Sequence, residues 1–127
     1  MKLVDTGCWI HAFRRQGDPV IRARLLDLVK NGQAAWCMPI RLELWAGIGS
    51  DYERRILREF EQEIPDYPIT NEVWQSACAL ADLGRQQGMR FPVTDLLVAA
   101  CAWHYNLELE HDDRHFVELT RLRRQTG

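Results

Sequence analysis

The longest apolar run in this sequence limits its fold more than any other feature. Eight consecutive apolar residues, Leu96 to Trp103, follow Thr94, which we expect to cap a helix over the run. A helix that is apolar almost all round has to be buried. The run is far too short to cross a bilayer, which takes about 20 residues. We therefore expect this helix inside a cytoplasmic protein that makes no membrane contact.

Short apolar segments alternate with helical segments along the chain. Strands are predicted at residues 2–4, 34–38, 67–69 and 107–109. Helices are predicted from capping residues and apolar spacing. The first three are a short helix around Ile10 and Phe13, one that begins after Asp18-Pro19, and one that begins at Pro39. The next is capped by Ser50 with Glu53 in a capping box, another is capped by Thr70 or Asn71, and the last covers residues 116–122. This alternation predicts an α/β fold with a mainly parallel sheet.

Composition is consistent with one domain in a reducing compartment. The 127 residues fit a single domain, and 46% of them are hydrophobic, enough for a core without disulfides. The four cysteines form no CxxC pair and sit among apolar neighbours, as small buried hydrophobic residues do. The net charge of −2 argues against simple RNA coating but leaves a nuclease open, because a cation would offset clustered carboxylates.

Four acidic residues occupy positions where an α/β domain collects functional groups. Asp5 directly follows the first strand, and Asp113 follows the last one. Glu43 lies on the helix after the second strand, and Asp95 lies in the first turn of the buried helix. The carboxyl ends of parallel strands meet at one edge of a sheet, so these side chains are expected to converge there.

The neighbours of two of these residues strengthen this interpretation. Asp95 is joined directly to the buried helix, and Glu43 is flanked by Leu42, Leu44 and Trp45, so both are expected near packed residues. Buried carboxylates need a partner, and no lysine or arginine is placed to neutralise all four. Like charges repel unless a cation lies between them, and oxygen ligands suit Mg²⁺ or Mn²⁺ better than zinc.

Four segments, in this order over nearly the whole chain, carry a resemblance to a known family. They are residues 2–10 (KLVDTGCWI), 40–44 (IRLEL) with Gly47, 94–100 (TDLLVAA) and 111–116 (HDDRHF). The chain resembles a PIN domain of the VapC-like toxin type. The resemblance implies a three-layer sandwich with a central parallel sheet over residues 1–127, an endoribonuclease with Asp5, Glu43, Asp95 and Asp113 as its acidic quartet, and a cognate antitoxin that covers the site.

The expected mechanism follows from those positions. Asp5, Asp95 and Asp113 are predicted to hold one or two Mg²⁺ ions, with Mn²⁺ as a substitute, and the metal polarises an RNA phosphodiester and activates a water molecule. Glu43 is expected to orient or deprotonate that water. Thr6 is expected to support Asp5 by hydrogen bonding, and it completes the predicted substrate-binding set with Arg14 and Arg15, whose charges would meet phosphates.

The chain departs from the family pattern in two places, and one assignment stays open. Gly7 stands where the family often has a small polar residue, so one hydrogen bond near Asp5 is expected to be lost. The chain ends at residues 123–127 with only a weak candidate for a final edge strand. Asp112 and Asp113 are adjacent; we prefer Asp113 as the fourth acid, because Asp-Arg-His-Phe matches the family's ending better.

Other interpretations remain beside this one. His111 and His115 are spaced i, i+4 and could bind zinc, although no HExxH pattern is present. The five tryptophans could stack bases, but their apolar neighbours favour core positions; exposed ones would favour a groove for a partner helix or a homodimer. An aspartyl phosphatase would want a second Asp at position 7, which is Gly. The main alternative is a non-catalytic PIN-like module that binds RNA or a protein.

Overall fold

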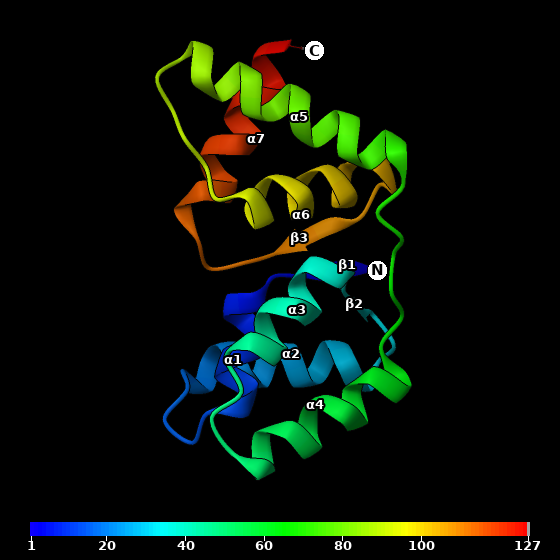
Figure 1. The fold of residues 1–127 in the computed structure, drawn as a ribbon. Coiled ribbons are helices and arrows are strands. Elements are labelled where there is room, and N and C mark those ends of the chain that lie inside the picture. Colours follow the sequence, from blue (N-terminus) through cyan, green and yellow to red (C-terminus); the bar gives the residue numbers. More distant parts are fainter. Residues whose placement is uncertain (127) are drawn as a thin grey trace.

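A three-stranded parallel sheet forms the centre of the structure, a computed structural model that describes residues 1–126 (Figure 1). The strands are β1 (Lys2–Val4), β2 (Ala34–Ala35) and β3 (Glu108–Glu110). The helices are α1 (Thr6–Phe13), α2 (Pro19–Lys30), α3 (Met38–Ala46), α4 (Asp51–Glu63), α5 (Asn71–Gln86), α6 (Val93–His104) and α7 (Arg114–Thr126). Position 127 of the expected domain lies outside the described residues.

The sheet has the strand order β2-β1-β3, with β1 at its centre and both neighbours parallel to it. Lys2 pairs with Ala34 on one side and with Glu108 on the other. In Figure 1, α5, α6 and α7 lie on one side of the strands, and α1 to α4 lie on the other. The predicted α/β fold, a three-layer sandwich around a parallel sheet, is confirmed.

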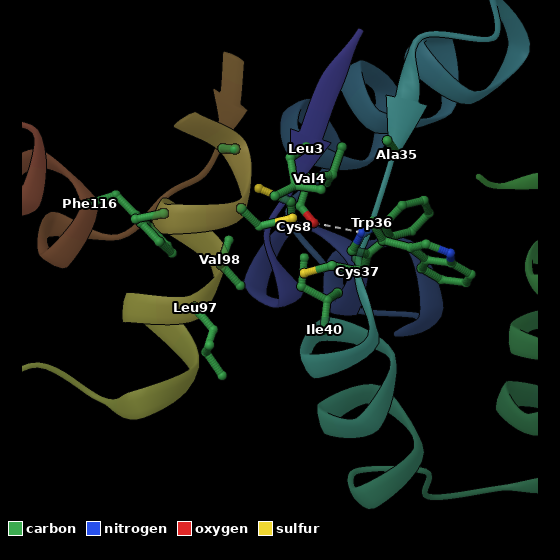
Figure 2. Packing of buried hydrophobic residues seen from close by; sticks show 14 of the residues in the cluster. Leu3, Val4, Cys8, Ala35, Trp36, Cys37, Ile40, Leu97, Val98 and Phe116 are labelled. Atoms are coloured by element: carbon green, nitrogen blue, oxygen red, sulfur yellow. Dashed lines mark hydrogen bonds between the residues drawn. The ribbon is translucent and has the colours of Figure 1, made fainter. Parts of the chain in front are cut away.

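The apolar run predicted to be a buried helix forms α6 and is the middle of the core. Every residue from Leu96 to Ala102 is buried, and only Trp103 at the end of the run is partly exposed. Figure 2 shows Val98 of this helix with Val4 of β1 and Phe116 of α7 in the same cluster of buried side chains. Burying α6 fixes the position of its first turn, where Asp95 lies.

Two predicted strands differ from those in the structure. The strand expected over residues 34–38 is limited to Ala34–Ala35, with Trp36 adding one isolated bridge to Asp66. The strand expected over residues 67–69 does not form. Pro68 has no N–H to donate to a sheet, and only the Tyr67 N–H continues the pairing, with the Trp36 carbonyl at 2.9 Å.

The helix caps follow the sequence with one exception. Asp18, Ser50 and Thr70 each accept backbone N–H groups at the starts of α2, α4 and α5, as predicted. Thr94 is not the cap of α6, because the helix begins at Val93 after Pro92, two residues earlier than a Thr94 cap implies. The C-terminal segment is the helix α7 in the described residues, so the final edge strand expected to be weak does not form there.

The cysteines and tryptophans are divided between core and surface. Cys8, Cys37 and Cys101 are buried free thiols, whereas Cys78 is free but exposed, so the expectation of four buried cysteines is wrong for one. Trp9 and Trp36 are fully buried. Of the other three, Trp45 and Trp103 are partly buried, and Trp74 is 49% exposed. Within the described part of the chain, no helix is long and apolar enough to cross a membrane.

Candidate metal centre

Asp5 is positioned by the end of the central strand. It follows Val4 directly, is only 6% exposed, and forms the N-cap of α1, where its carboxylate accepts the Gly7 N–H at 3.4 Å. Its own N–H donates to the carbonyl of Glu110 at the end of β3, at 2.9 Å. The sheet therefore fixes the backbone of Asp5, and the helix start fixes its side chain.

Asp95, Asp113 and His115 form one cluster where α6 and α7 begin. One ligand atom from each lies within 4.8 Å of the others. The His115 Nδ1 is 2.8 Å from Asp95 Oδ2 and 3.4 Å from Asp113 Oδ1. Asp113 precedes the first residue of α7 and also accepts the backbone N–H of His115 at 2.9 Å, which orients both side chains.

Glu43 is held by two hydroxyl groups from different elements. Thr6 Oγ1 at the start of α1 donates to Glu43 Oε1 at 2.6 Å, and Thr94 Oγ1 in α6 donates to Oε2 at 3.2 Å. The side chain is therefore oriented at both oxygens. Of its flanking residues, Leu44 is buried, but Leu42 is 69% exposed, so the packing expected around Glu43 is present on one side only.

The four carboxylates share one electrostatic environment. The pKa of the Asp5 carboxyl is raised to about 6, mainly because burial disfavours the charged form. The negative charges of Asp95 and Glu43 also contribute to this increase. Burial also raises the pKa of Asp95; the hydrogen bond from His115 opposes this shift, and the charges of Asp113 and Glu43 reinforce it. The structure thus brings together all four predicted acids, and their mutual repulsion is felt at the two buried members.

This environment fits a divalent cation. Two buried carboxylates lie beside two more, and in the described part of the chain the basic group in ion-pair contact with them is the imidazole of His115. Carboxylate oxygens are the ligands that Mg²⁺ and Mn²⁺ prefer. A cation between them would remove the repulsion and the burial cost that raise the pKa values of Asp5 and Asp95.

The surroundings of Asp112 and Asp113 differ, although the two residues are adjacent in the sequence. The cluster with Asp95 and His115 includes Asp113, as preferred. Asp112 is exposed, and its charge acts on the thiol of Cys8, whose pKa is raised to about 12 mainly by burial and then by Asp5 and other acids.

Thr6 does not support Asp5 in the way its hydroxyl suggested. Thr6 contacts Asp5 through its backbone N–H, which lowers the pKa of that carboxyl, while its hydroxyl belongs to Glu43. Gly7 likewise keeps a backbone hydrogen bond to Asp5. A Cβ at position 7 would lie 3.6 Å from Asp5 Oδ2, an ordinary contact, so a small polar residue would fit there.

Arg14 and Arg15 are exposed at the end of α1 and line a surface hollow of about 670 Å³ with Tyr52 of α4. A smaller hollow of about 50 Å³ is lined by Arg14 and by Glu43. Arg14 lines both hollows, and of the four acids Glu43 lines the smaller one. By contrast, the Arg54 and Arg58 side chains on α4 lie near Asp51 and over the Trp45 ring, respectively.

Two contacts of this site were missed from the sequence. His115 was considered only with His111 as a zinc pair; the cluster contains His115 alone, and the His111 ring packs on Phe116 instead. Thr94 was considered only as a cap. An aspartate at a helix start commonly accepts the backbone N–H two residues later. Because His115 lies two residues after Asp113, this local pattern could have placed His115 beside Asp113.

Comparisons with known proteins point to one family. Residues 2–122 match a family model described as PIN domain. Ribonuclease VapC21 of Mycobacterium tuberculosis is 29% identical over 112 residues, covering 84% of this chain and 80% of that protein. VapC ribonuclease Mb1587 of Mycobacterium bovis is 25% identical over 125 residues, covering 96% and 93%.

Two solved structures share the fold at low identity. One is VapBC2 from Rickettsia felis bound to a DNA fragment from their promoter, with a TM-score of 0.74, 19% identity, and coverage of 89% of this chain and 87% of that chain. The other is FitAcB from Neisseria gonorrhoeae, with a TM-score of 0.69, 18% identity, and coverage of 90% and 88%.

Proposed function

Since this chain belongs to the PIN domain family, we propose that it is a metal-dependent endoribonuclease, the toxin of a toxin–antitoxin pair. The convergence of Asp5, Glu43, Asp95 and Asp113 at one edge of the sheet carries this proposal. The relatives named ribonucleases support RNA as the substrate.

Each acidic residue has a role that its position supports. Asp5, Asp95 and Asp113 would hold Mg²⁺ or Mn²⁺, because two of them are buried and the third lies beside Asp95. When bound, the cation polarises the phosphodiester and makes water a stronger nucleophile. Glu43 would accept the proton of the attacking water, since its two oxygens are already oriented by Thr6 and Thr94.

The RNA strand would leave the acidic site along the hollows that Arg14 lines. Arg14 and Arg15 would contact phosphates, and the half-exposed ring of Tyr52 borders the same surface. Replacing both arginines with alanine should weaken RNA binding and flatten its salt dependence. The paired variant Arg54→Ala with Arg55→Ala is the control, and equal binding by both double variants would remove Arg14 and Arg15 from the proposal.

A cognate antitoxin is proposed as the protein partner. The similar solved structures include the two-component complexes VapBC2 and FitAB, which supports a partner for this chain as well. Such a protein would inhibit by covering the quartet. If a small gene lies next to the gene of this chain, co-expression of the two should give a stable complex that has lost RNA cleavage.

Cleavage of a nucleic-acid panel tests the activity itself. The panel holds structured RNAs, single-stranded RNA and single-stranded DNA, each with Mg²⁺, Mn²⁺ or chelator, for the wild type, Asp95→Asn and Asp82→Asn. Asp82 is an exposed acid on α5 paired with Arg85, so its variant controls for the loss of one charge. We expect metal-dependent RNA cleavage that only Asp95→Asn loses. Absence of both cleavage and metal binding would instead favour a non-catalytic binding module.

A further inference from the structure

One residue of the acidic site contributes nitrogen instead of oxygen. His115 lies at the start of α7, and its side chain is 41% exposed. Its Nδ1 contacts both Asp95 and Asp113, and within the described residues neither carboxylate forms an ion pair with a lysine or arginine. The proposed function gives a role to each of the four acids but none to the imidazole of His115.

The spacing of the three ligand atoms suits a shared cation. Two ligands at right angles around an ion at about 2.1 Å are about 3 Å apart, a consequence of metal–ligand distances alone. The Nδ1 of His115 lies 2.8 Å from the oxygen of Asp95 and 3.4 Å from that of Asp113. The imidazole is thus as close to each carboxylate as a neighbouring ligand would be.

Two features hold the imidazole in this place. The His115 backbone N–H donates to Asp113 Oδ1 at 2.9 Å, which fixes the main chain at the first turn of α7. The ring also makes an edge-to-face contact with Phe91, with centroids 6.0 Å apart at 87°. The main-chain hydrogen bond and this ring contact together restrict the position of the imidazole.

We propose that His115 is itself a metal ligand, so that this chain has a mixed carboxylate–imidazole centre that selects Mn²⁺ over Mg²⁺. The proposal rests on the metal-dependent function proposed above. Imidazole nitrogen suits transition ions, whereas Mg²⁺ prefers oxygen ligands alone. Removing the imidazole should therefore weaken Mn²⁺ binding more than Mg²⁺ binding and leave an ordinary carboxylate site.

Electron spin-echo spectroscopy of the protein loaded with Mn²⁺ tests this directly, because it detects a ¹⁴N nucleus bonded to the ion without any need for activity. The samples are the wild type, His115→Gln and His111→Gln. His111 is the matched control, a histidine four residues away whose ring packs on Phe116 and whose Nδ1 accepts the Asp113 backbone N–H at 3.4 Å. We expect ¹⁴N coupling in the wild type and in His111→Gln, and its loss in His115→Gln.

Calorimetric titrations with Mn²⁺ and Mg²⁺ give a second readout on the same proteins. The Mn²⁺ affinity should fall about tenfold or more in His115→Gln, on the scale of lost partners of a metal site, and the Mg²⁺ affinity should fall by less. Wild-type protein that binds Mn²⁺ without ¹⁴N coupling would overturn the role of His115 and leave the proposed nuclease standing. Wild-type protein that binds neither ion would overturn both.

The wild-type spectrum keeps the test valid if His115→Gln does not fold. Selective ¹⁵N labelling of histidine changes the coupling pattern only where a histidine nitrogen is bonded to Mn²⁺. A wild-type spectrum that is unchanged by this label would contradict the proposal without any variant.

Discussion

At the scale of single residues, burial of the Asp5 carboxylate lowers the free energy of unfolding of the metal-free protein at neutral pH. Its pKa is raised to about 6 from an ordinary 3.8, mainly by burial, so the folded state holds the proton more tightly than the unfolded state. Stability is then highest below pH 4 with respect to this group. It falls as the pH rises through 6, because the folded state has to accept a buried charge.

We predict that Asp5→Asn stabilises the metal-free protein above pH 6 and has little effect near pH 4. Asparagine keeps the N-cap of α1 and carries no charge. A pKa difference of about two units sets an upper limit of about 3 kcal/mol on the gain. Urea unfolding in chelator at both pH values measures it. The exposed Asp27→Asn is the control, and an equal effect of Asp5→Asn at both pH values would contradict this origin.

Glu43 owes its orientation to hydroxyl groups that sequence reasoning assigned elsewhere. Thr94→Val keeps the shape of the side chain but removes the donor to Oε2. We predict a roughly tenfold lower kcat for RNA cleavage with little change in KM, since orienting partners of a site have effects of that size. Thr120→Val, which loses only a hydroxyl contact to the Phe116 carbonyl within α7, should keep wild-type rates. Equal rates for both variants would show that this hydrogen bond does not matter.

Residue identity and chain position together predicted which carboxylates converge. Asp5 and Asp95 were found because one ends an apolar strand and the other begins an apolar helix, which are local patterns. The contact of Thr6 with Glu43 and that of His115 with Asp95 could not be found in that way. Each joins residues far apart in sequence or depends on side-chain rotation, and a short polar side chain has several partners within reach until the fold is known.

At the scale of helices and strands, the caps are the most predictable feature. The Ser50 hydroxyl accepts the Glu53 N–H at 3.1 Å, and Glu53 Oε2 in return accepts the Gly49 N–H at 3.2 Å. Ser50→Ala should lower the free energy of unfolding by about 1 kcal/mol. Ser76→Ala, on the exposed face of α5, should cost nothing or stabilise slightly, because alanine is the better helix former. Equal destabilisation by the two substitutions would show that the cap is not the cause.

Strands were less predictable than helices for a physical reason. A helix is stabilised by hydrogen bonds within its own segment, whereas a strand needs a partner that lies elsewhere in the sequence. The apolar residues 34–38 look like a strand of five, yet only Ala34 and Ala35 pair with β1 before the chain turns into α3. Residues 67–69 are apolar enough for a strand, but Pro68 has no backbone N–H to donate to a neighbouring strand.

At the scale of the whole molecule, the parallel sheet brings together acidic residues that lie far apart in the sequence. The ends of β1 and β3 and the starts of α6 and α7 bring together acids that are up to 108 positions apart. Parallel topology made this predictable, because the carboxyl ends of parallel strands share an edge. The sequence could not reveal the hollows beside Glu43, since they depend on how α1, α3 and α4 pack.

Metal binding should therefore stabilise the whole fold. A cation at 100 times its Kd would raise the free energy of unfolding by about 2.7 kcal/mol, because it binds the folded state alone. We predict that Mn²⁺ raises the melting temperature of the wild type and of Asp82→Asn, but not that of Asp95→Asn. Differential scanning calorimetry with and without chelator measures this. A similar increase in Asp95→Asn would place the cation elsewhere.

The central claim is that four carboxylates act together on RNA, and single-turnover cleavage of one end-labelled RNA by quartet variants tests it most directly. Asp5→Asn, Glu43→Gln, Asp95→Asn and Asp113→Asn are compared in Mn²⁺ with Asp112→Asn, the exposed neighbour of the fourth acid. The quartet predicts a loss of about 100-fold or more in each of the first four, on the scale of lost catalytic groups, and near wild-type cleavage by Asp112→Asn. Full activity in any of the four, or a loss confined to Asp112→Asn, would contradict it.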